Sequence, residues 1–165
     1  MSSAQIVFGV DPGLASLGWG IVVKDKGDLK VVKYGCITTK SSTELPARLI
    51  TIYDEIMHLF DTYKPDVLAI EKLFFGKNAK TAMVVGESRG VIMLSAAKRN
   101  LTIYEYSPAE IKIALTGYGN ADKNQVQRMV QQTLKLEKIP RPNHAADALA
   151  VAITASVSNN IIRRP

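Results

Sequence analysis

Acidic residues directly follow two apolar segments that have the composition of buried strands. Asp11 follows residues 6–10, and Glu71 follows residues 67–70. An unpaired charge at the edge of a low-dielectric core is costly, and open α/β sheets bind ligands where their strands end. Each residue could also be a solvated turn residue, as Asp11 could be before Pro12 and Gly13. Taken singly, each position leaves both interpretations open.

A third candidate lies near the C-terminus, where His144 and Asp147 are three residues apart in an apolar helical segment. This spacing puts both side chains on one face of the first helical turn. The helix dipole there favours an ionised carboxylate and a neutral imidazole, the forms in which both groups bind metal. Taken alone, the pair is also consistent with Asp147 complementing the dipole and His144 lying at the surface.

Three carboxylates and one imidazole from separate segments are more informative together. Mg²⁺ binds a few carboxylates, keeps several waters and shares phosphate oxygens with a substrate. Two such ions can stabilise the attacking and leaving oxygens of a phosphoryl transfer. The set therefore predicts metal-assisted phosphodiester chemistry, with His144 either as a fourth ligand or as a base for the attacking water. A Ser/His or Cys/His nucleophile is disfavoured, because the only other histidine, His58, has no evident nucleophile motif.

Basic and aromatic residues are concentrated beside one of these acids. Residues 72–104 contain six lysines and arginines against one acidic residue, and Phe74, Phe75 and Lys77 closely follow Glu71. Such a loop is typical of bases stacking on rings while ammonium groups contact phosphates. One Phe could instead pack the following helix against the core. Lys112 and Lys123 are further phosphate contacts or part of a solvated face.

The composition is consistent with a protein that binds nucleic acid in a reducing compartment. The chain has 165 residues, of which 47% are hydrophobic, and a net charge of +6. It is long enough to bury a core, and its positive charge suits a polyanion, although charge alone is also consistent with simple solubility. The single cysteine, Cys36, excludes an internal disulfide and is expected in the core. No signal peptide or membrane span is evident, so we expect a cytoplasmic protein.

Hydrophobic periodicity predicts one domain with the element order βββ-α-β-α-β-α. The expected strands are residues 6–10, 17–24, 29–39, 67–70 and 101–106, and the expected helices are 47–64, 78–99, 108–115, 123–136 and 143–157. An antiparallel trio followed by βα crossovers gives a mixed sheet with helices on both faces. The first and fourth strands should be central neighbours. The basic tail over about 158–165 is expected to be disordered.

Several motifs, in this order, resemble the RuvC-type Holliday junction resolvases of the RNase H-like superfamily. The resemblance covers nearly the whole chain. The segments are Gly9-Val10-Asp11-Pro12-Gly13 with Gly18-Trp19-Gly20, residues 69–78, Glu87-Ser88-Arg89-Gly90, residues 108–112, residues 117–126 and residues 144–150. The first motif alone is weak, since sugar kinases share it, whereas the ordered set is specific.

This resemblance implies an RNase H-like α/β fold, with three antiparallel strands and then two parallel ones. It implies that Asp11, Glu71, His144 and Asp147 bind two Mg²⁺ ions per subunit and carry the reaction. Many members have Asp at the position of His144, so this chain has one negative charge fewer and Mn²⁺ becomes an alternative ion.

The resemblance also implies how DNA and partner chains are bound. The residues expected to contact DNA are Phe74, Lys77, Lys112 and Lys123. Members work as homodimers that nick two symmetric strands of a four-way junction. The helix at 78–99 would then be the interface, with Gly86 and Gly90 permitting close approach, although tight packing within one subunit would also explain these glycines. A branch-migration complex of RuvA and RuvB is the implied partner.

Three other functions are consistent with parts of the sequence. A nuclease acting on RNA–DNA hybrids would keep the carboxylates but would need to recognise 2′-hydroxyls. A non-catalytic junction-binding module would use the acidic residues structurally. An ATP-binding, kinase-like domain could use Asp11-Pro12-Gly13, but it would need a second phosphate loop that we do not find.

Overall fold

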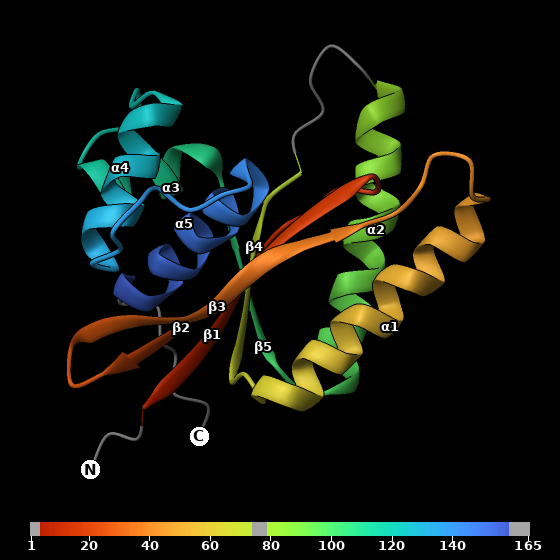
Figure 1. The fold of residues 1–165 in the computed structure, drawn as a ribbon, viewed down its shortest axis with the longest axis horizontal. Coiled ribbons are helices and arrows are strands. Elements are labelled where there is room, and N and C mark those ends of the chain that lie inside the picture. Colours follow the sequence, from red (N-terminus) through yellow and green to blue (C-terminus); the bar gives the residue numbers. More distant parts are fainter. Residues whose placement is uncertain (1–3, 74–78, 159–165) are drawn as a thin grey trace.

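A five-stranded mixed sheet forms the centre of the molecule. The computed structural model describes residues 4–73 and 79–158 (Figure 1). The strand order is β3-β2-β1-β4-β5, with β1 (Gln5–Asp11), β2 (Ser16–Asp25), β3 (Asp28–Thr38), β4 (Val67–Glu71) and β5 (Thr102–Tyr106). The first three strands pair antiparallel, whereas β4 lies parallel to β1 and β5 parallel to β4. The predicted mixed sheet is confirmed, including β1 and β4 as central neighbours.

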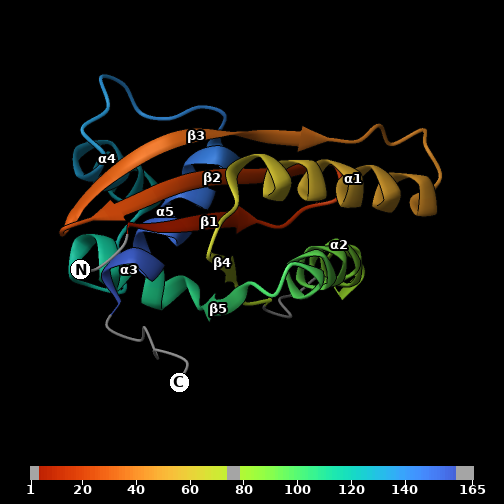
Figure 2. The same cartoon turned by 90° about the horizontal axis from the view of Figure 1, so that it is seen from below.

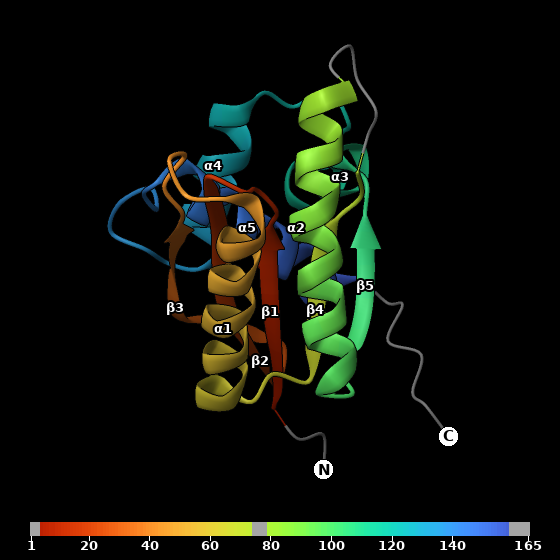
Figure 3. The same ribbon diagram turned by 90° about the vertical axis from the view of Figure 1, so that its right-hand side faces the viewer.

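Helices cover both faces of this sheet, also as predicted. They are α1 (Leu45–Tyr63), α2 (Ala79–Lys98), α3 (Pro108–Thr116), α4 (Lys123–Thr133) and α5 (Asn143–Val157). Figure 3 shows α1 and α2 in front of the strands and α3, α4 and α5 behind them, and Figure 2 shows the same separation from below. The arrangement is that of an RNase H-like fold.

Element boundaries differ from the predicted ones by a few residues, for identifiable reasons. Helix α1 begins before residue 47 because Pro46 lies in its first turn. Proline is tolerated there, since the N–H groups of the first turn have no hydrogen-bond partner within the helix. Helix α4 ends at Thr133, three residues before the predicted end, and Lys135 has a left-handed backbone with φ of 52°. The first residue of the helix predicted over 78–99 and residues 159–165 of the predicted tail lie outside the described residues.

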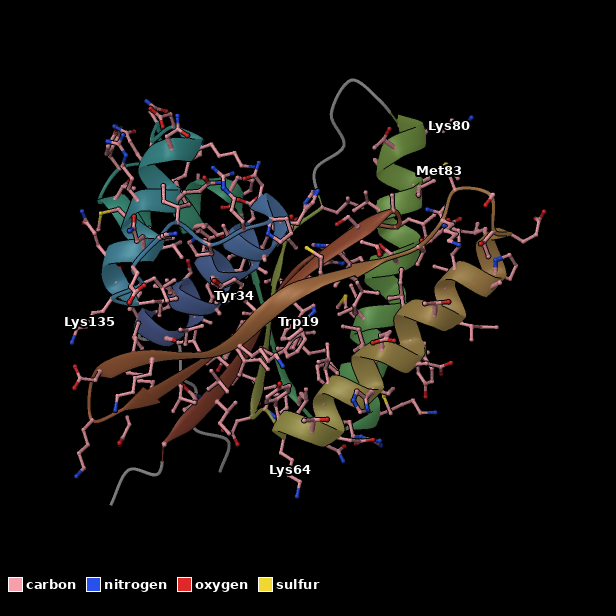
Figure 4. All side chains as sticks on the ribbon, viewed as in Figure 1. Trp19, Tyr34, Lys64, Lys80, Met83 and Lys135 are labelled. Atoms are coloured by element: carbon pink, nitrogen blue, oxygen red, sulfur yellow. The ribbon has the colours of Figure 1, made fainter. Side chains whose placement is uncertain are left out.

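Two hydrophobic clusters hold the helices to the two faces. Phe8 and Trp19 face α1 and α2, and the ring of Phe8 packs edge-on against Phe60 of α1 at 5.0 Å. Tyr34 packs against the other cluster, on the α5 side, and Figure 4 labels both Trp19 and Tyr34 on their strands. Cys36, expected in the core, is only half-buried on β3. The sheet is therefore fixed from both sides, which is what a precise site at its edge requires.

Helix α5 lies unusually close to the sheet. Nearly every residue from Ala145 to Ser156 is buried, because β1 and β2 cover one side of the helix and α3 and α4 the other. Glycines in the strands permit this approach. A Cβ at Gly9 would lie 2.2 Å from the carbonyl oxygen of Ala148, and one at Gly18 would lie 1.9 Å from that of His144. The absence of these two side chains sets the height of α5 above the strands.

Candidate active site

The ends of β1 and β4 bring the first two candidate residues to one edge of the sheet. The two strands are parallel neighbours, with Val10 paired to Ile70. Asp11 and Glu71 are each the last residue of their strand, so Asp11 lies within the strand that we expected it to follow. In Figure 1 both strands run upward to the same edge. Their side chains leave a buried strand end and are only half-buried.

The first turn of α5 adds the imidazole and the third carboxylate. The His144 Nδ1 atom lies 2.8 Å from the Asp11 Oδ2 atom, across 133 residues of sequence. Asp11, His144 and Asp147 each offer a ligand atom, and these atoms all lie within 4.8 Å of one another. The separation is one that a single divalent ion can span. Three of the four predicted residues thus meet in one group.

Glu71 stands at the edge of this group. Its oxygens lie outside the compact set of three, yet it lines the same cavity as Asp11, a space of about 200 Å³ that Arg89 and Pro108 also border. Burial, together with repulsion from Asp11 and then from Asp147, raises the pKa of Glu71 to about 7. The shared cavity brings Glu71 next to Asp11, and the raised pKa is consistent with that proximity.

The site is short of positive charge near its buried carboxylates. Burial also raises the pKa of Asp11, and repulsion from Asp147 adds to this, while the hydrogen bond from His144 opposes it. Two carboxylates whose ionised forms are disfavoured by burial and by each other are stabilised by a cation. Carboxylate oxygens and one imidazole suit a hard or borderline divalent ion such as Mg²⁺ or Mn²⁺. The donor set therefore fits the metal that the sequence predicts.

Lys123, predicted to contact DNA, lies directly beside the carboxylates of the candidate site. It is the first residue of α4, and its Nζ atom is 3.0 Å from the Asp147 Oδ2 atom. Its side chain is 57% exposed, so this ion pair contributes little to stability, and the ammonium remains free to turn toward an incoming phosphate. Lys112 is half-buried on α3. Phe74 and Lys77 lie outside the described residues.

Arg89 is a neighbour of the site whose role the sequence did not reveal. Its guanidinium bonds the Glu105 carboxylate, and its Nε atom donates to the main-chain oxygen of Glu71 at 3.4 Å. The side chain is only 15% exposed. It therefore ties α2 to the ends of β4 and β5, directly beneath a candidate ligand. Its place in the motif Glu87-Ser88-Arg89-Gly90 was the available signal, but this motif does not indicate which strands the side chain reaches.

The raised pKa of Glu71 predicts a stability effect that metal should remove. Because the folded state holds this proton more tightly than the unfolded one, the metal-free protein should lose stability as pH rises from about 4.5 to about 7. Glu71→Gln removes this penalty. We expect it to stabilise the metal-free protein at pH 8 by about 1–2 kcal/mol, a Tm rise of about 2–8 °C, with solvent screening keeping the gain modest. Thermal unfolding in EDTA at pH 5 and pH 8 measures it.

Glu110 provides a control of opposite sign. Its pKa is lowered, mainly by hydrogen bonds within the capping box at Ser107 and less by Lys72. Its stabilising effect is therefore present above its unfolded pKa and is lost as pH falls. Glu110→Gln should lower the Tm at pH 8, where Glu71→Gln raises it. A Glu71→Gln variant that is less stable than the parent at pH 8 would contradict the electrostatic description of the site.

Fold and site together define a class of protein: an RNase H-like nuclease with acidic residues at the ends of its central strands that could hold a metal ion. The family model of crossover junction endodeoxyribonuclease RuvC matches residues 7–155. The RuvC protein of a Roseiflexus species is 48% identical over 162 residues, covering 98% of this chain and 96% of that protein. The chain belongs to the RuvC family of crossover junction endodeoxyribonucleases.

Solved structures agree with this assignment. The structure of Thermus thermophilus RuvC matches with a TM-score of 0.85 and 33% identity, over 91% of this chain and 92% of that one. The same T. thermophilus protein in complex with a Holliday junction substrate matches with a TM-score of 0.84 and 29% identity, over the same shares. Among the helices in the described part of the chain, none is both long and apolar enough to cross a membrane.

Proposed function

We propose that this protein resolves four-way DNA junctions by paired symmetric nicks, using two Mg²⁺ ions per subunit, in DNA recombination and repair in the cytoplasm. The observation that carries the proposal is the convergence of Asp11, His144 and Asp147 within 4.8 Å, with Glu71 coupled to them. The RuvC structure with a Holliday junction substrate, which this fold closely matches, supports the choice of DNA.

The carboxylates would have different tasks. Asp11 contacts His144 and lines a cavity with Glu71, so it would hold both ions, while Glu71 and Asp147 would each hold one. When bound, the ions would neutralise charge at the phosphate and lower the pKa of a water. The residues of the chain would hold the scissile phosphodiester beside that water. Lys123, on the Asp147 side, would contact the phosphate, with Phe74, Lys77 and Lys112 binding the flanking strand.

His144 has two roles that fit its position. An ionised carboxylate only accepts hydrogen bonds, so with Asp11 ionised the His144 Nδ1 atom carries the proton and the Nε2 lone pair remains available. With the side chain 52% exposed, that lone pair can either bind an ion or take a proton from the attacking water. Both roles require a neutral imidazole.

Competing substrates decide between this function and its nearest alternative. We expect single-turnover cleavage of a mobile four-way DNA junction with Mg²⁺ to exceed cleavage of an RNA–DNA hybrid of equal length by at least about 100-fold, a difference of about 2.7 kcal/mol in the barrier. Preference for the hybrid would overturn the substrate assignment. Junction binding without any cutting under Mg²⁺ or Mn²⁺ would instead identify a non-catalytic binding module.

A homodimer through α2 is part of the proposal. Met83 and Leu94 lie three helical turns apart on one face of this helix and are 65% and 57% exposed. Gly90 lies between them, exposed, and a Cβ there would meet nothing within 4 Å among the described residues, while one at Gly86 would meet only Leu73 at 3.4 Å. Packing within the subunit therefore does not explain Gly90. Close approach of a second α2 does, and a RuvA–RuvB complex would act on the assembled dimer.

A larger side chain at Gly90 should lower the affinity of the dimer without destabilising the monomer. Gly90→Gln improves helix propensity by up to about 1 kcal/mol, so the fold should be retained or stabilised. Overpacking the helix–helix contact should weaken association by about 10- to 100-fold, as measured by sedimentation equilibrium. Ile50→Gln, which changes an exposed apolar residue on α1, is the control and should leave association unchanged. If Gly90→Gln and Ile50→Gln dimerise with equal affinity, α2 is not the dimer interface.

A further inference from the structure

A second cavity lies beside the carboxylate site, on the other side of the loop that follows Asp11. It has a volume of about 500 Å³ and is bounded by residues 12–16, by the starts of α1 and α2, and by His144. Part of its wall is apolar, formed by Pro12, Leu14, Val84 and Val85. His144 belongs to both spaces, since it also contacts Asp11. The cavity is therefore contiguous with the proposed reaction centre.

Arg48 is fixed in place at this cavity. Its Nε atom donates to the Thr39 hydroxyl at 2.8 Å, and that hydroxyl donates to the main-chain oxygen of Leu14 at 2.5 Å. One nitrogen of the guanidinium is thus attached to the Asp11 loop. Its two terminal nitrogens make no hydrogen bond or ion pair within residues 4–73 and 79–158. A planar donor held in this way is suited to a phosphate.

Lys80, on the first turn of α2, is the second cation on the wall. It has no acidic partner in the described part of the chain, and no acidic residue lines the cavity. Only some cations of the described residues are ion-paired, namely Lys72, Arg89, Arg99 and Lys123. The first turns of α1, α2 and α5 also contribute Arg48, Lys80 and His144, so three helix N-termini add positive partial charge to the same space.

We infer that this cavity binds one nucleotide of the DNA strand, adjacent to the phosphodiester that the carboxylate site cuts. Arg48 and Lys80 hold its phosphate, and the base lies against Leu14, Val84 and Val85. The volume falls in the range of small-molecule sites, and cations beside an apolar wall are what a single-stranded nucleotide requires. The inference rests on the proposed function, since it assigns a further subsite to the same substrate.

Charge favours a nucleotide over a segment of another protein chain. A peptide in this cavity would have to carry acidic groups to match two unpaired cations, and a second copy of this chain has a net charge of +6. DNA supplies one negative charge per nucleotide, and neutralising it releases counterions. Arg48 is linked through Thr39 to Leu14, in the loop that directly follows Asp11, so occupation of the cavity positions the strand relative to the metal ligands.

Neutral linkages in the DNA test the phosphate contact. Junction binding is measured with Ca²⁺, using methylphosphonates placed singly at the three linkages on each side of the cut. At one of them the wild type should lose about 10-fold in affinity. Arg48→Gln should bind the unmodified junction about 10-fold more weakly than the wild type does. A methylphosphonate at that same linkage should not weaken its binding any further. Lys64→Gln removes the same charge at the far end of α1, as Figure 4 shows, and should keep the wild-type response.

A second variant tests the base contact without changing charge. Ala15 is exposed and lines the cavity, so Ala15→Phe should fold and partly fill the space. It should slow cleavage of the ordinary junction about 10-fold and recover much of this on a junction with an abasic site at the same nucleotide.

Three outcomes would overturn the inference. In the first, the losses of affinity caused by Arg48→Gln and by a methylphosphonate add at every linkage. In the second, Ala15→Phe cleaves the ordinary junction at the wild-type rate. In the third, either variant dimerises poorly, which would indicate that a protein occupies the cavity. None of these outcomes bears on whether the parent protein cuts junctions. Failure of the proposed function would instead appear as no preference of the parent for junctions.

Discussion

Asp11→Asn should lower the rate of junction cleavage about a thousandfold or more while leaving the junction bound. The side chain keeps its size, but it loses the charge that lies between Glu71 and the α5 residues. Removing a bridging ligand costs about 4 kcal/mol of transition-state stabilisation, which corresponds to this rate. Burial already disfavours the ionised form of Asp11, so the metal-free variant should be as stable as the parent or more stable.

The measurement is single-turnover cleavage at saturating protein, with binding followed separately in Ca²⁺. Asp54→Asn, which removes an exposed carboxylate on α1, controls for net charge and should cut at the parental rate. Asp11→Asn retaining full Mg²⁺-dependent cutting would mean that the convergent carboxylates have a structural role, and the assigned mechanism would be wrong. Loss of binding in parallel with cutting would place Asp11 in DNA recognition instead.

Gly18→Ala should be strongly destabilising, although it adds only one methyl group. The added Cβ would lie 1.9 Å from the carbonyl oxygen of His144 and 2.9 Å from its Cβ, and the first of these is a main-chain atom that no rotamer change can move. Helix α5 must rise from β2, which weakens much of one hydrophobic cluster. We expect a loss of about 3 kcal/mol or more, a fall in Tm of about 6–12 °C.

Activity should fall even at temperatures where this variant is folded, because His144 is the residue displaced and Asp147 lies one turn further on. Circular dichroism melting gives the stability, and cleavage at 20 °C gives the activity. Gly119→Ala is the control, since a Cβ there meets only Ile113 at 3.8 Å. Similar melting temperatures for the two variants would show that α5 can shift without cost and that its height above the sheet is not set by glycine.

The element order could be predicted because local patterns carried it. Period-two and helical periodicities separated the strands from the helices, and the apolar residues 67–70 identified a central parallel strand. The position of Asp11 and Glu71 at one sheet edge follows from that parallel pairing alone. That part of the site was accessible because it needs only topology.

The remaining details depend on distances between segments that no local pattern encodes. Lys123 pairs with Asp147 because the start of α4 lies beside α5, and Arg89 reaches Glu105 and the end of β4 from α2. Neither contact has a spacing in the sequence. The roles of Gly9 and Gly18 were likewise inaccessible from the sequence, since a glycine in a strand indicates close approach without identifying the partner.

The contact between Asp11 and His144 joins the first strand of the chain to its last helix. During synthesis, Asp11 leaves the ribosome more than a hundred residues before its partner, and α5 is also the helix that completes the core between the sheet, α3 and α4. A nascent or partly unfolded chain therefore has no assembled metal centre. If these residues hold the metal as proposed, cleavage by a newly made chain has to wait until α5 has packed against the sheet.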